Sequence, residues 1–118
     1  MATWIATALV ATLAFANVTG TWTGTLSPEG EDPTSAHLVL QQDGETVTGT
    51  AGANEQGERL TIRNGIAKDG VVTFEVETPG GHLMKFDLKE QGDELTGTVT
   101  RERDGEKARA TLSVKRVK

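Results

Sequence analysis

From Val18 onward, apolar and polar side chains alternate with a period of two. This alternation is typical of strands that bury one face, because successive side chains point to opposite sides of a sheet. Pairs such as Asp-Gly and Asn-Gly interrupt the pattern and favour tight hairpins. No stretch after Asn17 has a helical period. The pattern predicts eight strands, over residues 18–26, 35–42, 45–51, 59–66, 71–78, 82–90, 93–103 and 106–117.

The side chains that each hairpin would bring together support this assignment, because opposite charges and apolar pairs favour cross-strand pairing. A two-residue turn at 104–105 pairs Arg103 with Glu106, Glu102 with Lys107, Glu94 with Lys115, Val99 with Ala110, Gly97 with Leu112, and Leu95 with Val114. A three-residue turn at 79–81 pairs Phe74 with Phe86, Val76 with Met84, and Glu75 with Lys85. A two-residue turn at 43–44 pairs Leu40 with Val47 and Leu38 with Gly49.

One face of every predicted strand is apolar, and in residues 59–66 that face comprises Leu60, Ile62 and Ile66. A long antiparallel sheet without a covering helix must curl and close to hide such a face. We therefore predict an all-β fold: an eight-stranded antiparallel up-and-down (meander) β-barrel, formed by a single domain over residues 17–118. The interior of such a barrel is filled by side chains or holds one small ligand.

The first 16 residues carry no charged side chain and end in the small-x-small triplet Ala14-Phe15-Ala16. This is typical of a secretory signal peptide cleaved before Asn17, which predicts a secreted or periplasmic protein. The alternative is a retained apolar helix that packs on the domain or on other copies of the chain. In that case the segment is the only part that would contact a membrane, and the oligomeric state stays open.

Composition narrows the function further. The net charge of −5 argues against nucleic-acid binding, and the lack of cysteine excludes disulfides and thiolate metal sites. The sequence has no G-x-S-x-G element, and its two histidines have no recognisable triad context. The acidic loop over residues 27–34 lacks the ligand spacing of a known metal site. We predict no catalysis, no cofactor and no metal.

Gly20-Thr21-Trp22 in the first strand resembles the G-x-W element of the calycin superfamily, which includes lipocalins and avidins. "VTGTWTGTLS" is similar to the start of avidin-type proteins. In calycins a basic residue of the last strand covers that tryptophan, and here Arg116 is in phase with the inward Leu112 and Val114. The resemblance implies that Trp22 and Arg116 form a structural floor. Biotin binding is not carried over, because the chain has no tyrosine and its inward positions are nearly all aliphatic.

Ligands enter a barrel at the end opposite its floor, so the candidate ligand contacts are the inward residues near that mouth: Leu26, Ala36, Leu38, Ala51, Asn64, Phe74, Val76, Met84 and Phe86. Asn64 is either a polar ligand contact or, since it precedes Gly65, the marker of a bulge or turn. The sequence predicts a barrel that binds a small, mostly apolar ligand. The alternative is a packed-core interaction or accessory module that acts through its loops or through an oligomerising N-terminal segment.

Overall fold

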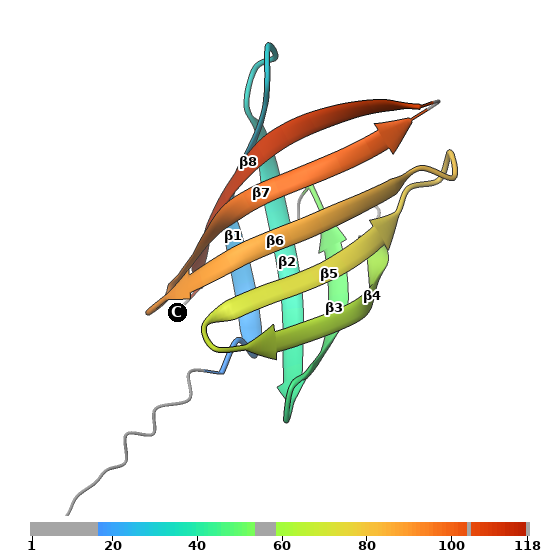
Figure 1. Ribbon diagram of the computed structural model, residues 1–118. Helices are drawn as coiled ribbons and strands as arrows, with labels where there is room; N and C mark the ends of the chain where they lie inside the picture. Colours follow the sequence, from blue (N-terminus) through green and yellow to red (C-terminus); the bar gives the residue numbers. More distant parts are fainter. Residues whose placement is uncertain (1–16, 54–58, 104, 118) are drawn as a thin grey trace, which may run out of the picture.

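The computed structural model describes residues 17–53, 59–103 and 105–117, so the apolar segment 1–16 lies outside the described residues. The chain forms eight strands: β1 (Gly20–Pro28), β2 (Thr34–Asp43), β3 (Thr46–Gly52), β4 (Arg59–Lys68), β5 (Val71–Glu77), β6 (Leu83–Gln91), β7 (Glu94–Arg103) and β8 (Glu106–Arg116). Each strand pairs antiparallel with the next, and β8 pairs with β1 to close the barrel (Figure 1). The predicted eight-stranded meander barrel is confirmed.

The register of two hairpins is as predicted. Phe74 lies opposite Phe86 and Glu75 opposite Lys85 between β5 and β6. Between β7 and β8, all six expected pairs are present, from Leu95 opposite Val114 to Arg103 opposite Glu106. Opposite charges and apolar pairs stabilise these registers, and a shift by one residue would reverse the inward and outward faces.

The predicted register of β2 and β3 is wrong. The turn consists of Gly44 and Glu45, so Leu40 lies opposite Gly49 and not opposite Val47. Gly44 has a φ of 65°, as the first central position of a type II′ turn requires, whereas Asp43 remains in the strand. The inward face is unchanged, because the pairing moves by two positions.

Strand β4 contains a bulge that moves Ile66 to the outside of the barrel. The pairing with β5 shifts between Arg63 and Ile66, and Asn64 has a φ of 55°. The extra residue reverses the alternation, so Ile66 is 50% exposed and Ala67 packs against the core in its place. The prediction that Ile66 faces inward is therefore wrong, and β4 continues past the Asn64-Gly65 pair to Lys68.

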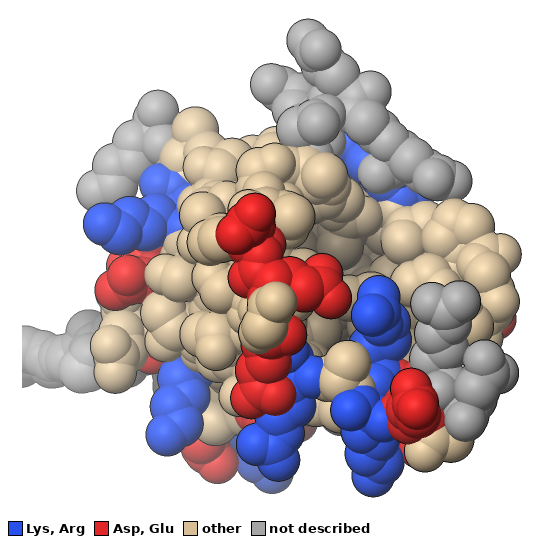
Figure 2. Space-filling model, turned by 90° about the horizontal axis from the view of Figure 1, so that it is seen from above, with Lys and Arg blue, Asp and Glu red and all other residues tan. Residues whose placement is uncertain are grey.

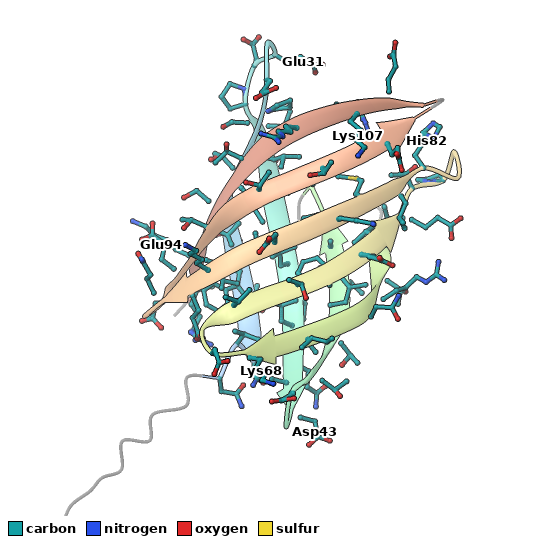
Figure 3. The ribbon with its side chains drawn as sticks, viewed as in Figure 1. Glu31, Asp43, Lys68, His82, Glu94 and Lys107 are labelled. Carbon is teal, nitrogen blue, oxygen red and sulfur yellow. The ribbon has the colours of Figure 1, made fainter. Side chains whose placement is uncertain are left out.

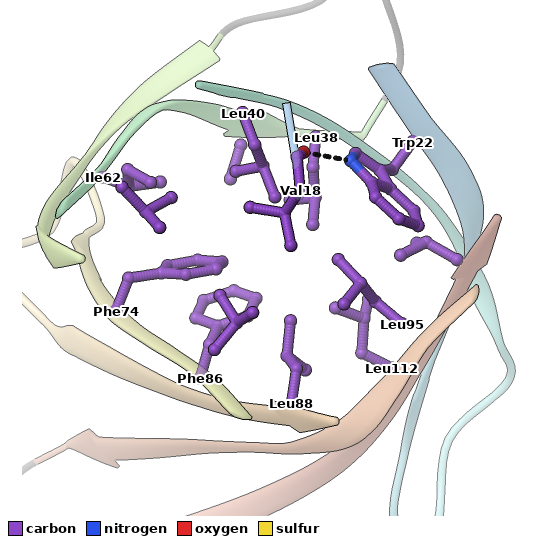
Figure 4. Close-up of a cluster of buried hydrophobic side chains, with 14 of the residues drawn as sticks. Val18, Trp22, Leu38, Leu40, Ile62, Phe74, Phe86, Leu88, Leu95 and Leu112 are labelled. Atoms are coloured by element: carbon purple, nitrogen blue, oxygen red, sulfur yellow. Dashed lines mark hydrogen bonds between the residues drawn. The ribbon is translucent and has the colours of Figure 1, made fainter. Parts of the chain in front are cut away.

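The barrel interior is one apolar core, to which all eight strands contribute. Phe74 and Phe86 stack within it, with ring centroids 4.5 Å apart and ring planes at 20° (Figure 4). Inward glycines let the strands curl tightly around these side chains. A Cβ at Gly24 would lie 1.9 Å from the Ser113 carbonyl oxygen, and one at Gly97 would lie 2.0 Å from that of Asp87. No L side chain fits there without moving a neighbouring strand.

Candidate functional site

The barrel has two ends that differ in construction. We call "mouth" the end with the β1–β2, β3–β4, β5–β6 and β7–β8 connections, and "closed end" the one with the β2–β3, β4–β5 and β6–β7 turns. Glu31, His82 and Lys107 lie toward the mouth, and Asp43 and Lys68 lie at the closed end (Figure 3). In the described ranges, no helix is long and apolar enough to cross a membrane.

The closed end is plugged by Val18 and Trp22, each of which is 0% exposed. The first strand was predicted to begin at Val18, but β1 begins at Gly20; the Val18 side chain nevertheless enters the core. The Trp22 indole Nε1 donates a hydrogen bond of 3.0 Å to the Val18 carbonyl oxygen (Figure 4). The backbone N–H of Val18 donates to Gln42 Oε1 at 2.9 Å. These bonds hold the incoming chain across the base of the barrel.

Arg116, near the end of β8, covers the same tryptophan. Its Cζ lies 4.4 Å from the centroid of the Trp22 ring, a cation–π distance. Its Nε donates to Asp93 Oδ1 at 2.9 Å, its Nη2 donates to the Asn17 carbonyl oxygen at 3.0 Å, and its Nη1 donates to that of Thr19. The contact expected between Trp22 and Arg116 is present. Arg116 thus ties the last strand to the segment that leads into the first.

The mouth contains a cavity of about 210 Å³. Seven of the nine predicted ligand contacts line it: Leu26, Ala36, Leu38, Ala51, Val76, Met84 and Phe86. The other two do not. Phe74 lies deeper and is 2% exposed, and the exposed Asn64 lies on the outer surface, where its Nδ2 donates to Glu75 Oε1 at 3.0 Å. The placement of Asn64 inside the barrel is wrong, because the bulge turns it outward.

The walls of this cavity are mostly hydrocarbon. Six residues outside the predicted ligand contacts complete the lining: Thr34, Ser35, Gly52, Ala53, Leu60 and Leu112. Ser35 Oγ donates to the Ala53 carbonyl oxygen at 2.9 Å, and Thr34 Oγ1 donates to that of Leu26 at 3.4 Å. Both hydroxyl protons are therefore engaged with the backbone, so the lining presents apolar surface to a ligand.

Among the described residues, charged side chains lie around the mouth and none lines its cavity. Glu29, Glu31 and Asp32 of the β1–β2 connection are exposed. Seen from above, acidic side chains gather in the middle of this face beside a hollow of uncharged residues, and lysines and arginines lie around its edge (Figure 2). Among the residues that the structure describes, no three histidine, aspartate or glutamate side chains are grouped to hold a metal ion.

A second cavity, of about 740 Å³, lies at the closed end between the β2–β3, β4–β5 and β6–β7 turns. Sequence analysis missed its most unusual residue, Glu90. Period two from Phe86 and Leu88 places Glu90 on the inward face, and this signal was available in the sequence. Its Oε2 is buried and has no hydrogen-bond partner. Burial raises the pKa of the Glu90 carboxyl, and the Arg116 guanidinium offsets part of this rise.

Comparison with known proteins shows the fold alone. No protein-family model matches the chain, and no curated protein matches it either. A solved structure of a redesigned β-barrel is similar, with a TM-score of 0.63 over 86% of this chain and 92% of that chain. The two sequences are 14% identical, so the likeness extends to the architecture of the barrel and not to a ligand or activity.

Proposed function

We propose that this protein is a non-catalytic binding barrel that holds one small, mostly apolar ligand at its mouth. The observation that supports the proposal is the cavity of about 210 Å³. It lies at one end of the barrel, and side chains from seven strands converge on it. Ligand sites are typically concave and apolar, and they are largely formed before the ligand arrives.

The size and lining of the cavity limit the ligand. A volume of about 210 Å³ is below the roughly 300–1,000 Å³ of common ligand pockets, so the bound part of the ligand is small or the rest projects into solvent. With both nearby hydroxyls bonded to backbone carbonyls, recognition rests on burial of hydrocarbon. A short alkyl chain or a single ring fits this chemistry.

We also propose a structural class and a cellular location for this protein. The G-x-W element in β1, together with the stacking of Arg116 on Trp22, supports a calycin-like barrel. The uncharged N-terminal segment supports secretion or a periplasmic location. Both features fit a small carrier protein that meets its ligand outside the cytoplasm.

Titration with 1-hexanol tests the binding function. We expect hexanol to shift the NMR amide signals of Ala36 and Ala51 in the wild-type protein, because its chain enters the mouth. Ala51→Leu fills the cavity from its wall, and we expect it to weaken hexanol binding by about tenfold or more. Thr61→Leu is the matched control, since Thr61 lies on the outer face of β4 beside Leu60.

Two results would contradict this proposal. One is the absence of mouth shifts at saturating hexanol, and the other is equal affinity in the wild type and Ala51→Leu. Either would favour the alternative, an interaction module that acts through its loops or its N-terminal segment. Should Ala51→Leu fail to fold, Ala36→Val offers a smaller change in the same wall. Native mass spectrometry of protein from its own host would then identify the natural ligand by its mass.

A further inference from the structure

We propose that the closed end of the barrel is a second binding site, which takes a small organic cation through the carboxylate of Glu90. This site is independent of the ligand proposed for the mouth. It is defined by a cavity of about 740 Å³ between Asn17, the ends of β2, β4 and β6, the start of β5 and the adjoining turns. That volume lies within the range of ordinary ligand pockets.

One oxygen of the Glu90 carboxylate has no hydrogen-bond partner among the described residues. Its Oε2 is buried without a hydrogen bond, which is costly for a charged oxygen. The Arg116 guanidinium acts on the charge of Glu90, but its hydrogen bonds go to Asp93, Asn17 and Thr19. The positive charge that acts on Glu90 thus belongs to a guanidinium whose N–H groups already donate to other residues. An ammonium group bound in the cavity would place a further positive charge beside this carboxylate.

The charges that line this cavity favour a cation. Three carboxylates line it, those of Glu45, Asp69 and Glu90, against one ammonium group, that of Lys68. The net charge of the lining is thus −2 when all four groups are ionised (one positive minus three negative). Such a lining attracts a positively charged ligand and repels an anion.

The remaining lining offers room for a hydrocarbon body. Ala67, Val71 and Val72 contribute apolar surface between the charged groups. Val71 is 37% exposed, which is unusual for a large apolar side chain in this protein. Gln42 contributes little to recognition, because its Oε1 accepts from Val18 and its Nε2 donates to Gly44. The chemical class that fits is an ammonium group on a short apolar body.

Benzylammonium is a suitable probe, with benzyl alcohol and benzoate as neutral and anionic molecules of similar shape. We expect benzylammonium to shift the NMR amide signals of Gly70, Val71 and Gly92 in the full chain. Benzyl alcohol and benzoate should leave these signals almost unchanged. Glu90→Gln removes the charge and should weaken benzylammonium binding by about tenfold or more, as the loss of a charge-assisted hydrogen bond does.

Asp87→Asn is the control for Glu90→Gln. It makes the same change of charge on the same strand, but Asp87 is exposed on the outer face. We expect its affinity for benzylammonium to stay within about twofold of the wild type. If Glu90→Gln does not fold, Asp69→Asn decides the question. Asp69 has a φ of 56° in a turn, where Asn is equally accommodated, and its loss should weaken binding by a few fold.

The proposal is overturned if benzylammonium leaves the closed-end amides unshifted, as it would if residues before Asn17 filled the cavity. It is also overturned if benzyl alcohol binds equally well, or if Glu90→Gln and Asp87→Asn behave alike. Shifts confined to Ala36 and Ala51 would place the cation at the mouth and would equally reject a closed-end site. None of these results bears on hexanol binding, so the two proposals fail separately.

Discussion

The two ends of this barrel are built from the same alternating strands but are filled differently. At the closed end, Trp22 and Val18 are fully buried in the core, and the cavity there is lined by the turns beyond them. At the mouth, the corresponding inward positions are the small Ala36 and Ala51, and a hollow remains between them and Met84. Since strand number fixes the diameter of a barrel, the size of the inward side chains decides where it is solid and where it is hollow.

Trp22→Ala should show the largest effect on stability, because it removes the largest side chain from the filled end. We expect the free energy of unfolding to fall by about 3–5 kcal/mol, the usual cost of truncating a buried tryptophan. Urea denaturation followed by circular dichroism measures this change. A loss below about 1 kcal/mol would mean that the closed end is not supported by Trp22.

Truncating one side chain in the packed core and one at the mouth should lower the free energy of unfolding by different amounts. Leu88 is 0% exposed, and we expect Leu88→Ala to lower the free energy of unfolding by about 2–5 kcal/mol. Met84 is half-buried at the mouth, and we expect Met84→Ala to lower the free energy of unfolding by about 1 kcal/mol, since its surroundings are already open. Parallel urea titrations of the two variants compare the ends directly. Equal losses would show that the mouth is as tightly packed as the core.

Arg116→Lys should have a smaller effect that is specific to the closed end. A lysine keeps the charge but cannot reach Asp93, Asn17 and Thr19 from a planar fork. We expect a loss of about 1–2 kcal/mol in the free energy of unfolding, as for one or two hydrogen bonds. Amide hydrogen exchange near Val18 should become faster, while exchange at the mouth should not change. Faster exchange at both ends would argue against a local role.

Glu90→Gln should have the smallest effect, and its sign depends on pH. Because burial raises the pKa of Glu90 in the folded state, protonation favours folding. This contribution is complete below the pKa of the unfolded chain and disappears as the pH rises through the folded-state pKa. Glutamine imitates the protonated carboxyl, so its stability relative to the wild type should increase from about pH 3 to about pH 7. Thermal melts at both pH values test this, and a relative decrease would contradict the assigned direction.

Much of the fold follows from the alternation and from the turn residues. The registers of β5–β6 and β7–β8 were predictable because complementary charges and apolar pairs meet in only one alignment. The turn between β2 and β3 was not, because Asp43-Gly44 and Gly44-Glu45 both keep the apolar face inward. The choice depends on which turn position needs the positive φ of Gly44. Pattern alone does not distinguish alignments that differ by two residues.

The residues of the candidate site were also predictable only in part. Seven mouth residues were predictable from strand phase, since their strands are regular up to the mouth. Asn64 and Ile66 were misplaced because a bulge reverses the phase within β4, although the Asn-Gly pair had suggested it. Glu90 lies in phase with Leu88 but was overlooked, because a charged residue at the end of a strand is usually exposed to solvent. Its burial depends on how the turns of the closed end fold over it.

The seam between β1 and β8 has a consequence for how the protein is made. The Arg116 contact to Thr19 spans 97 residues of sequence, and β8 leaves the ribosome after the other seven strands. Until then, β1 and β7 both present unpaired edges, which are templates for association with other chains. Completion of the ring is therefore a long-range event that waits for the eighth strand. A variant that lacks β8 should aggregate and not merely lose stability.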